Sequence, residues 1–365
     1  MVMGKRDDVE TAIAPIATVA VVGLGQQVVN GLVRVPFRRP WRGPAGVLHN
    51  LGAATTRQVL RSFMGYSTSL PIEEFRSIEV VLDDLCRVAL PPFVRGLGVE
   101  MRAGSVGGVP GLWYRRRNHD PLGTIVYLHG GGYIGTSPTM YAAFTGWLAR
   151  ETGCEIFVAD YRLAPEFPFP AGVIDTISVV RELLDDGADP DTMFIAGDSG
   201  GGGLAGSLLF EMQQQELPLP AGLILFSPEV DLILDEPSIS ENAGRDILPW
   251  NIPVAAYVHG VDPSDNEVSV VNADVSHYPP TFVAFGDDEM FRDPIRRFVD
   301  VLEAGGVDTT VVEERGMFHV YPILMPWADA SRRTYREVGR FVSERLVARN
   351  PFNQAAANAV PAVEH

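Results

Sequence analysis

From residue 99 onward, short runs of apolar and β-branched residues alternate with longer segments whose apolar positions recur at helical spacing. This alternation is typical of a mostly parallel sheet with helices on both faces. The inner runs are almost continuously apolar, as expected for strands that are buried on both sides. Strands are expected at residues 99–102, 112–115, 124–128, 156–159, 193–196, 223–226, 281–285 and 309–313. Helices are expected at residues 141–152, 171–186, 202–215, 295–304 and 328–349.

The segment before residue 99 has a different pattern, which is helical and contains no convincing strand. We expect residues 1–98 to form a helical cap or extension and residues 99–350 to form one α/β domain. A helical cap insertion is expected near residues 235–260, and residues 351–365 are expected to be a flexible tail. Open α/β sheets bind ligands at the carboxyl ends of their strands. Both helical parts are therefore expected to cover that edge of the sheet.

Composition and charge narrow the range of functions. The chain has 365 residues, of which 46% are hydrophobic, and its formal net charge is −17. A binder of nucleic acid in general needs a basic face, so this class is not expected. The two cysteines, Cys86 and Cys154, are too few for a zinc ligand set or a disulfide framework. Cytoplasmic location is the default expectation, and Cys154 is expected to be buried.

The basic charge is concentrated near the N-terminus, because residues 1–65 carry eight basic and three acidic side chains. Within this part, residues 11–29 form an uncharged apolar stretch. Acidic residues precede this stretch at the place where a signal peptide carries positive charge, which argues against a signal peptide. Its proline, glycines and glutamines make it a poor membrane span. We expect a helix that packs on the body of the protein. Peripheral membrane contact, helped by the arginines that follow, and export are the alternatives.

The first candidate for chemistry is the run Gly197-Asp198-Ser199-Gly200-Gly201, which follows one expected strand and opens the next expected helix. A G-x-S-x-G motif in this strand–turn–helix context is typical of a nucleophile elbow. The tight turn needs neighbours without side chains. The helix N-terminus behind the serine places N–H groups beside a developing oxyanion. The alternative is a glycine-rich turn with an incidental serine.

The second candidate is the run His129-Gly130-Gly131-Gly132-Tyr133, directly after the expected strand 124–128. Three glycines allow main-chain amides to point into a shared pocket, as a tetrahedral oxyanion requires. A flexible loop is one alternative. A phosphate loop is another, but its Gly-Lys-Ser/Thr or G-x-G-x-x-G spacing does not occur here. His129 is expected to orient the loop through hydrogen bonds.

Together with three further blocks, these motifs resemble the hormone-sensitive-lipase family of α/β-hydrolases, the microbial esterases and lipases with an HGGG loop. The resemblance covers roughly residues 99–347 and is vague before them. The blocks are HGGGY at 129–133, DYRLAPEFPFPA at 160–171, GDSGG at 197–201, SPEVDL at 227–232 and FHVYP at 318–322. The resemblance implies an α/β-hydrolase fold, with a mostly parallel sheet of about eight strands, flanking helices and a helical cap.

The resemblance also implies roles for residues in these blocks. Ser199 would be the nucleophile, and the N–H groups of Gly131, Gly132 and Gly200 would form the oxyanion hole. The family's elbow usually reads GDSAG, with alanine where this chain has Gly200, and that change leaves the N–H in place. Structural hydrogen bonds and ion pairs are expected of the other charged motif residues, which are Asp160, Arg162, Glu166 and Asp198.

The base of such a site follows its acid in the chain order Ser–acid–His. Six of the seven histidines lie in segments without the motif, in the glycine loop or at the terminus; they are His49, His119, His129, His259, His277 and His365. That leaves His319, which lies between the expected strand 309–313 and the last helix.

The acid is expected among three consecutive carboxylates, Asp287, Asp288 and Glu289, at the end of an expected strand. The family pattern is an acid followed four residues later by Asp, and counting back from Asp293 gives Glu289. The family more often has aspartate here, but glutamate is chemically adequate. Asp288 and then Asp287 remain alternatives. Asp293 itself is expected to cap the following helix.

The resemblance implies a serine carboxylesterase that hydrolyses short- to medium-chain acyl esters through an acyl-enzyme. A lipase, a lactonase, or an amidase or carbamate hydrolase could use the same triad. Some relatives are hormone receptors, which typically lack the histidine, so a non-catalytic binding protein is the least favoured alternative. No metal or organic cofactor is implied. A homodimer, common in the family, is an alternative to a monomer.

Overall fold

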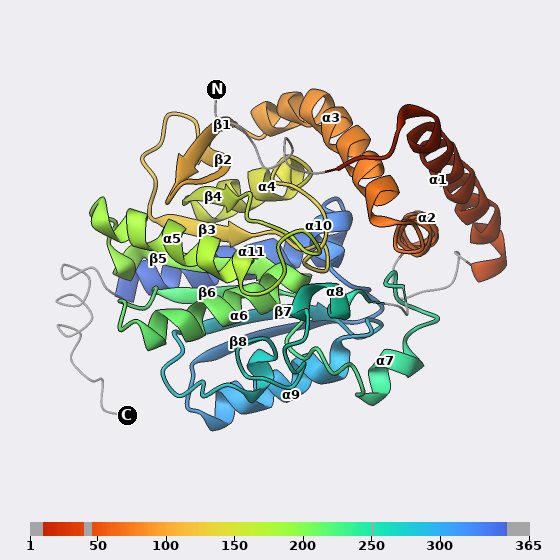
Figure 1. The fold of residues 1–365 in the computed structure, drawn as a ribbon. Coiled ribbons are helices and arrows are strands. Elements are labelled where there is room, and N and C mark those ends of the chain that lie inside the picture. The colour runs from red at the N-terminus through yellow and green to blue at the C-terminus, as the bar shows by residue number, and fades with distance from the viewer. Residues whose placement is uncertain (1–9, 40–45, 250–251, 349–365) are drawn as a thin grey trace.

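The computed structural model describes residues 10–39, 46–249 and 252–348. It contains one sheet with strand order β1-β2-β4-β3-β5-β6-β7-β8 (Figure 1). β1 pairs antiparallel with β2 and β2 with β4, whereas all the other neighbours are parallel. The strands are β1 (Val99–Val106), β2 (Val109–Arg116), β3 (Thr124–Leu128), β4 (Glu155–Ala159), β5 (Met193–Asp198), β6 (Gly222–Phe226), β7 (Thr281–Gly286) and β8 (Thr309–Glu314). The predicted α/β fold with an eight-stranded, mostly parallel sheet is confirmed.

Two hydrophobic cores lie on opposite faces of the sheet. The helices α5 (Ala171–Asp185), α6 (Ser199–Gln214) and α9 (Arg292–Ala304) cover the face that is in front in Figure 1. The helices α4 (Ala142–Thr152) and α11 (Asp329–Ala348) cover the other face. Successive residues of a strand point to opposite faces. Within β5, Ile195 therefore joins the first core while Phe194 and Ala196 join the second, which explains why the inner strands are continuously apolar.

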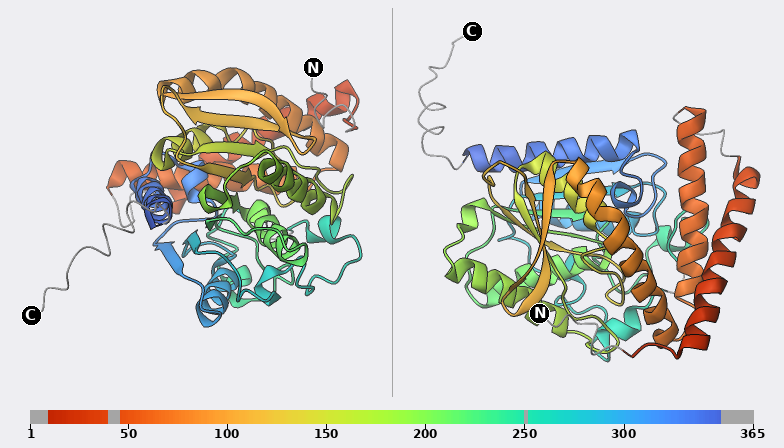
Figure 2. Two further views of the ribbon diagram at one scale, coloured as in Figure 1. Left: turned by 90° about the vertical axis from the view of Figure 1, so that its left-hand side faces the viewer. Right: turned by 90° about the horizontal axis from the view of Figure 1, so that it is seen from above.

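Before β1 the described chain is helical. The elements are α1 (Ala14–Arg34), the short 3₁₀ helix η2 (Val35–Arg38), α2 (Val47–Ser67) and α3 (Ile72–Gly96). α3 packs against α4 and β1, α2 lies beyond it, and α1 lies along the outside of α2 (Figures 1 and 2). The remaining short helices are η3 (Pro190–Thr192), α7 (Pro237–Glu241), α8 (Val254–Val258), η4 (Val270–Asn272) and α10 (Tyr321–Leu324).

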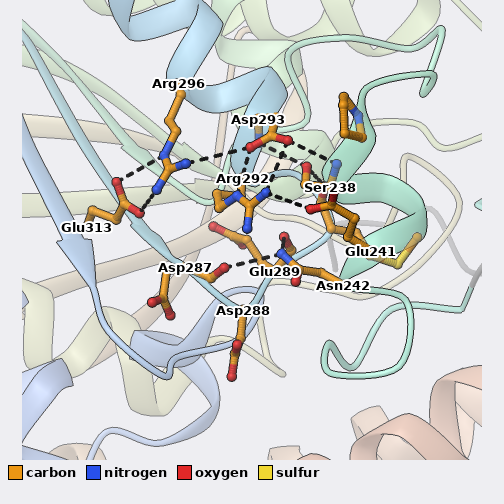
Figure 3. Close-up of polar contacts among 12 residues, drawn as sticks. Ser238, Glu241, Asn242, Asp287, Asp288, Glu289, Arg292, Asp293, Arg296 and Glu313 are labelled. Carbon is orange, nitrogen blue, oxygen red and sulfur yellow. Dashed lines mark hydrogen bonds and ion pairs between the residues drawn. The ribbon is translucent and has the colours of Figure 1, made fainter.

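Two helices begin three residues earlier than expected from the sequence. α6 begins at Ser199 and not at residue 202, because the elbow serine is itself the first helical residue. α9 begins at Arg292, so the expected N-cap role of Asp293 is wrong. Asp293 lies in the first turn, where its carboxylate pairs with Arg292 and accepts the backbone N–H of Ser238 (Figure 3). Acidic side chains also interact favourably with the helix dipole there.

Candidate active site

Ser199 lies at the sharp turn between β5 and α6, and the positions two residues before and two residues after it admit only glycine. The serine itself has a positive φ of 52°. A Cβ on Gly197 would lie 2.4 Å from the carbonyl oxygen of Gly201, and a Cβ on Gly201 would lie 2.2 Å from that of Leu128. Both distances are shorter than any real contact, so the backbone can turn this tightly only without these side chains. The turn leaves the Ser199 hydroxyl at the carboxyl end of a central strand.

Three side chains far apart in the sequence form one hydrogen-bonded chain. The Nε2 atom of His319 lies 2.8 Å from the Oγ atom of Ser199. On the other side of the ring, Nδ1 lies 3.1 Å from Oε2 of Glu289. All three residues are buried. With the proton on Nδ1, the ring donates to the carboxylate and accepts from the hydroxyl, which is the arrangement of a nucleophile, a base and an orienting acid.

Of the three consecutive carboxylates, Glu289 is the one that reaches His319. Its Oε1 also accepts the backbone N–H of Gly286, at 2.9 Å. The Asp288 side chain instead pairs with Arg57 of α2, and the Asp287 side chain accepts the backbone N–H of Gly316. Figure 3 shows Asp287 and Asp288 on the side of this loop away from Asp293 and α9. Asp287 and Asp288 therefore stabilise the conformation of this loop.

The loop that carries Asp287, Asp288 and Glu289 is held in place by residues of α7 and the residue that follows it. Asn242 donates through Nδ2 to the carbonyl oxygens of Glu289, at 2.9 Å, and Asp287, at 3.2 Å. Ser238 and Asp293 exchange two hydrogen bonds, each of 3.0 Å (Figure 3). The insertion between β6 and β7 thus determines where the Glu289 backbone lies.

A residue that the sequence analysis missed, Asp246, connects the loops that carry His319 and Glu289. Its Oδ1 accepts the backbone N–H of His319, at 3.0 Å, and its Oδ2 accepts that of Met290, at 2.7 Å. The side chain is fully buried, and Arg61 of α2 donates to its backbone carbonyl at 2.8 Å. The local sequence carried no signal for this role, because both partners lie more than forty residues away.

Burial controls the protonation of the His319–Glu289 pair. Burial lowers the pKa of His319, against the carboxylates of Asp246 and Asp198, which raise it. Burial also raises the pKa of Glu289, while hydrogen bonds from Ser227 and Gly286 lower it. The imidazole is therefore neutral near pH 7 and can accept a proton.

The glycine loop after β3 lies against the elbow. Gly131 has φ of +116°, and a Cβ there would lie 2.3 Å from the carbonyl oxygen of Gly135. A Cβ on Gly200 would lie 2.9 Å from the backbone nitrogen of Tyr133, which shows how closely loop and helix approach. As an N-terminal residue of α6, Gly200 has an N–H without an acceptor inside the helix. The structure therefore places the glycine loop, through Tyr133, against Gly200, the residue directly after Ser199.

Asp198, directly before the serine, fastens this loop to the elbow. Its carboxylate accepts the Tyr127 and Tyr141 hydroxyls, both at 2.8 Å, and the Gly130 N–H, at 2.9 Å. Burial raises its pKa to about 6, against these three hydrogen bonds, which lower it. His129 contacts the Gly130 carbonyl and the Thr136 hydroxyl through Nδ1. The expected orienting and structural roles of both residues agree with these contacts.

Side chains of α3 support the far side of the same loop, and the sequence analysis did not foresee this. Arg76 is buried and donates to the carbonyl oxygens of Ile134 and Ala164. It also forms ion pairs with Glu166, at 2.6 Å, and with Glu79. Glu79 in turn accepts the backbone N–H of Thr136. The helix before the α/β domain thus helps to hold the glycine loop in place.

Within the described parts of the chain, no group of three or more histidine, cysteine, aspartate and glutamate side chains is arranged to hold a metal ion. Cys86 and Cys154 are both free thiols, and Cys154 is buried as expected.

Comparison with known proteins agrees with the geometry. Residues 125–323 match a family described as having the alpha/beta hydrolase fold. The chain is 31% identical to an acetyl-hydrolase of Streptomyces hygroscopicus over 65% of this chain and 81% of the relative. It is 32% identical to a carboxylesterase of Mycobacterium tuberculosis, over 67% and 82%. A crystal structure of an esterase from the bacterial hormone-sensitive lipase family superposes with a TM-score of 0.71 and 28% identity, over 80% of this chain and 98% of that one. The chain belongs to the α/β-hydrolases, in the hormone-sensitive-lipase family of esterases.

Proposed function

We propose that this esterase is a serine carboxylesterase for short- to medium-chain acyl esters, with Ser199 as nucleophile, His319 as general base and acid, and Glu289 as the acid that orients His319. The observation that carries the proposal is the hydrogen-bonded chain of Ser199, His319 and Glu289, with atom distances of 2.8 and 3.1 Å. Such a chain is the geometric signature of an activated nucleophile.

The reaction follows from this geometry in two halves. Ser199 Oγ attacks the ester carbonyl while His319 Nε2 takes the hydroxyl proton, and the imidazolium then gives that proton to the leaving alcohol. Water next attacks the acyl-enzyme, with His319 as its base, and the acid product leaves with Ser199 restored. The Glu289 carboxylate keeps the proton on Nδ1 and stabilises the imidazolium that forms in each half.

The oxyanion of each tetrahedral intermediate would bind the N–H groups of Gly131, Gly132 and Gly200. The contact between the glycine loop and Gly200 supports this assignment, as does the position of Gly200 at the start of α6. One such donor contributes about 3–4 kcal/mol to transition-state stabilisation in a comparable enzyme. Because Asp198, His129 and Arg76 hold the loop before substrate arrives, little reorganisation is needed during the reaction.

The names of the relatives support a short acyl group, since they include an acetyl-hydrolase and a carboxylesterase. Two side chains beside the glycine loop come from the insertion between β6 and β7: Tyr257 stacks on Tyr133 at 3.7 Å between ring centres, and Pro253 lies nearest to Gly132. We therefore assign this insertion, together with α3, whose Phe75 lies against Gly135, to a cap that shapes the substrate pocket.

A series of p-nitrophenyl esters tests the substrate class. We expect kcat/KM to be highest for the acetate, butyrate or hexanoate and to fall steeply toward the palmitate, because the proposed cap would leave room for a short acyl group only. Parallel assays with a lactone and an anilide measure the competing activities. A maximum for palmitate, or faster opening of the lactone, would overturn the chain-length and ester assignments while leaving the triad intact.

Gly131→Ala is expected to lower kcat at least tenfold with little change in KM, because the new Cβ collides with the Gly135 carbonyl and displaces the N–H of residue 131. Gly244→Ala is the matched control, since no atom lies within 4 Å of its Cβ position. Steady-state kinetics of both variants provide the measurement. A raised KM with unchanged kcat would mean that the loop binds substrate and does not stabilise the transition state.

Asp246→Asn is expected to lower kcat by roughly 10- to 100-fold. The amide has one oxygen in place of two, so it can accept the backbone N–H of His319 or of Met290 but not both, and the loop that loses its hydrogen bond must shift. The lost negative charge also lowers the pKa of His319, which Asp246 raises in the native protein. The acidic limb of kcat/KM should therefore move to lower pH. Asp274→Asn, on an exposed loop, is the control. An unmoved pH limb would show that Asp246 acts on folding alone.

A further inference from the structure

The outer face of α1 carries an apolar stripe. Val19, Val22, Val29 and Val33 recur at helical spacing and have between 56% and 70% of their surface exposed. The stripe continues into η2, where Phe37 is 81% exposed. α1 with η2 is the one described helix that is long and apolar enough to cross a membrane, and 11% of its most apolar window is buried. Isolated exposed apolar residues need no explanation, but several on one face of a helix, here interrupted by Gln26, indicate a binding surface.

The opposite face of α1 is fitted to the rest of the protein. The Tyr66 hydroxyl of α2 donates to the Ala20 carbonyl at 3.2 Å, and the Gly23 position faces the same tyrosine ring. Gly31 lies so close to the backbone of Gln58 that a Cβ would come within 2.9 Å of its carbonyl oxygen. A helix held by such contacts is part of the fold, so its outer stripe stays at the surface and the helix does not need to span a bilayer.

The charge around the stripe identifies the partner. Residues 11–72 contain six arginines and no acidic residue, whereas the whole chain has a net charge of −17. The rest of the chain therefore carries −23. Arg34, Arg38 and Arg39 are exposed at the end of the stripe. An anionic membrane presents negative charge everywhere along its surface and apolar chains beneath it, which complements both the arginines and the apolar stripe.

We propose that the outer face of α1, with Arg34, Arg38 and Arg39 at its end, docks the enzyme on the surface of anionic lipid bilayers. The valines and Phe37 enter the interface between headgroups and acyl chains, and the arginines contact lipid phosphates. The acidic remainder of the protein is repelled from the same surface, which orients the molecule with α1 against the lipid. The inference does not depend on the substrate assigned above.

Vesicle flotation of the full-length protein tests this docking. We expect binding to vesicles of phosphatidylcholine with phosphatidylglycerol, at least tenfold weaker binding to pure phosphatidylcholine, and release at high salt. Val22→Ser/Val29→Ser and Arg34→Gln/Arg38→Gln should each lower the bound fraction at least fivefold. Ile174→Ser, an exposed apolar position on α5, should have no effect. Hydrolysis of a soluble acetate ester, unchanged in every variant, shows that the fold is retained.

Three results would overturn the inference. Binding that is equal on neutral and anionic vesicles would remove the role of the arginines. Protein that detergent extracts but salt does not would indicate a spanning helix. A dimer, measured by analytical ultracentrifugation without lipid and lost in the double-valine variant, would show that the stripe binds a second copy of the chain.

Discussion

Replacing Ser199 by alanine is expected to abolish ester hydrolysis, with a loss in kcat on the order of 10⁶ by analogy with other serine hydrolases. The reason is that no other nucleophile is in contact with His319 Nε2 in the site as we describe it. The fold should survive, because the elbow depends on its glycines and on the β5–α6 connection more than on the hydroxyl. Steady-state hydrolysis of p-nitrophenyl acetate measures the loss.

Covalent labelling gives a second readout of the same prediction. A fluorophosphonate should label the native protein at Ser199 and leave Ser199→Ala unlabelled. Ser207→Ala is the matched control, since Ser207 is a buried serine on the same helix that donates to the Glu267 carbonyl. Hydrolysis at the native rate by Ser199→Ala would refute the proposed function. Loss of hydrolysis and of labelling in Ser207→Ala as well would indicate that the substitutions damage α6.

Glu289→Gln is expected to lower kcat by about 10²–10⁴-fold. A serine protease loses about 10⁴ when its triad aspartate becomes asparagine, because the imidazole adopts the wrong tautomer. An amide at position 289 can likewise donate to Nδ1, which would leave the proton on Nε2, facing Ser199. The buried carboxylates of Asp246 and Asp198 still stabilise an imidazolium, so the loss should not exceed that of the protease.

Asp287→Asn and Asp288→Asn are the matched controls for this variant, because they remove a neighbouring carboxylate from the same loop. Each should cost less than tenfold in kcat. Asp288 pairs with Arg57, and Asp287 holds the N–H of Gly316, so these changes act through loop shape. If Asp288→Asn proves the most damaging of the three, the acid is assigned to the wrong residue, although the esterase family would stand.

Most of the fold followed from local pattern. The strand β3 was predicted with its observed bounds, and the other strands were predicted within their observed ranges. The errors came at the ends of elements. β1 and β2 extend further than predicted because they form an antiparallel hairpin. The hydrogen bonds between the two strands also hold residues that lack a strongly apolar pattern in the extended conformation. The start of α9 at Arg292 depended on contacts with Ser238 from another segment.

For the candidate site, the sequence predicted the parts that short motifs define. Gly197, Ser199 and the glycine loop are short-range patterns, since a tight turn and converging amides require particular residues at particular spacings. His319 followed from chain order. The spacing to Asp293 favoured Glu289, with Asp288 and Asp287 as alternatives that the sequence did not exclude. These three adjacent side chains point in different directions, and only the packing of α7, α9 and the His319 loop determines which one meets the imidazole.

The sequence by itself determined the alternation of strands and helices, the elbow around Ser199, the glycine loop and the uneven distribution of charge. Each of these depends on residues close together in the chain. Only the tertiary structure decided that Glu289 contacts His319, that Asp246 joins their loops, that Arg76 supports the glycine loop, and that the valine stripe of α1 faces outward. The physical reason is that the partner of a buried polar group is often distant in the sequence and is brought near only by the fold. Likewise, a helix face is exposed or buried according to which other elements pack against it.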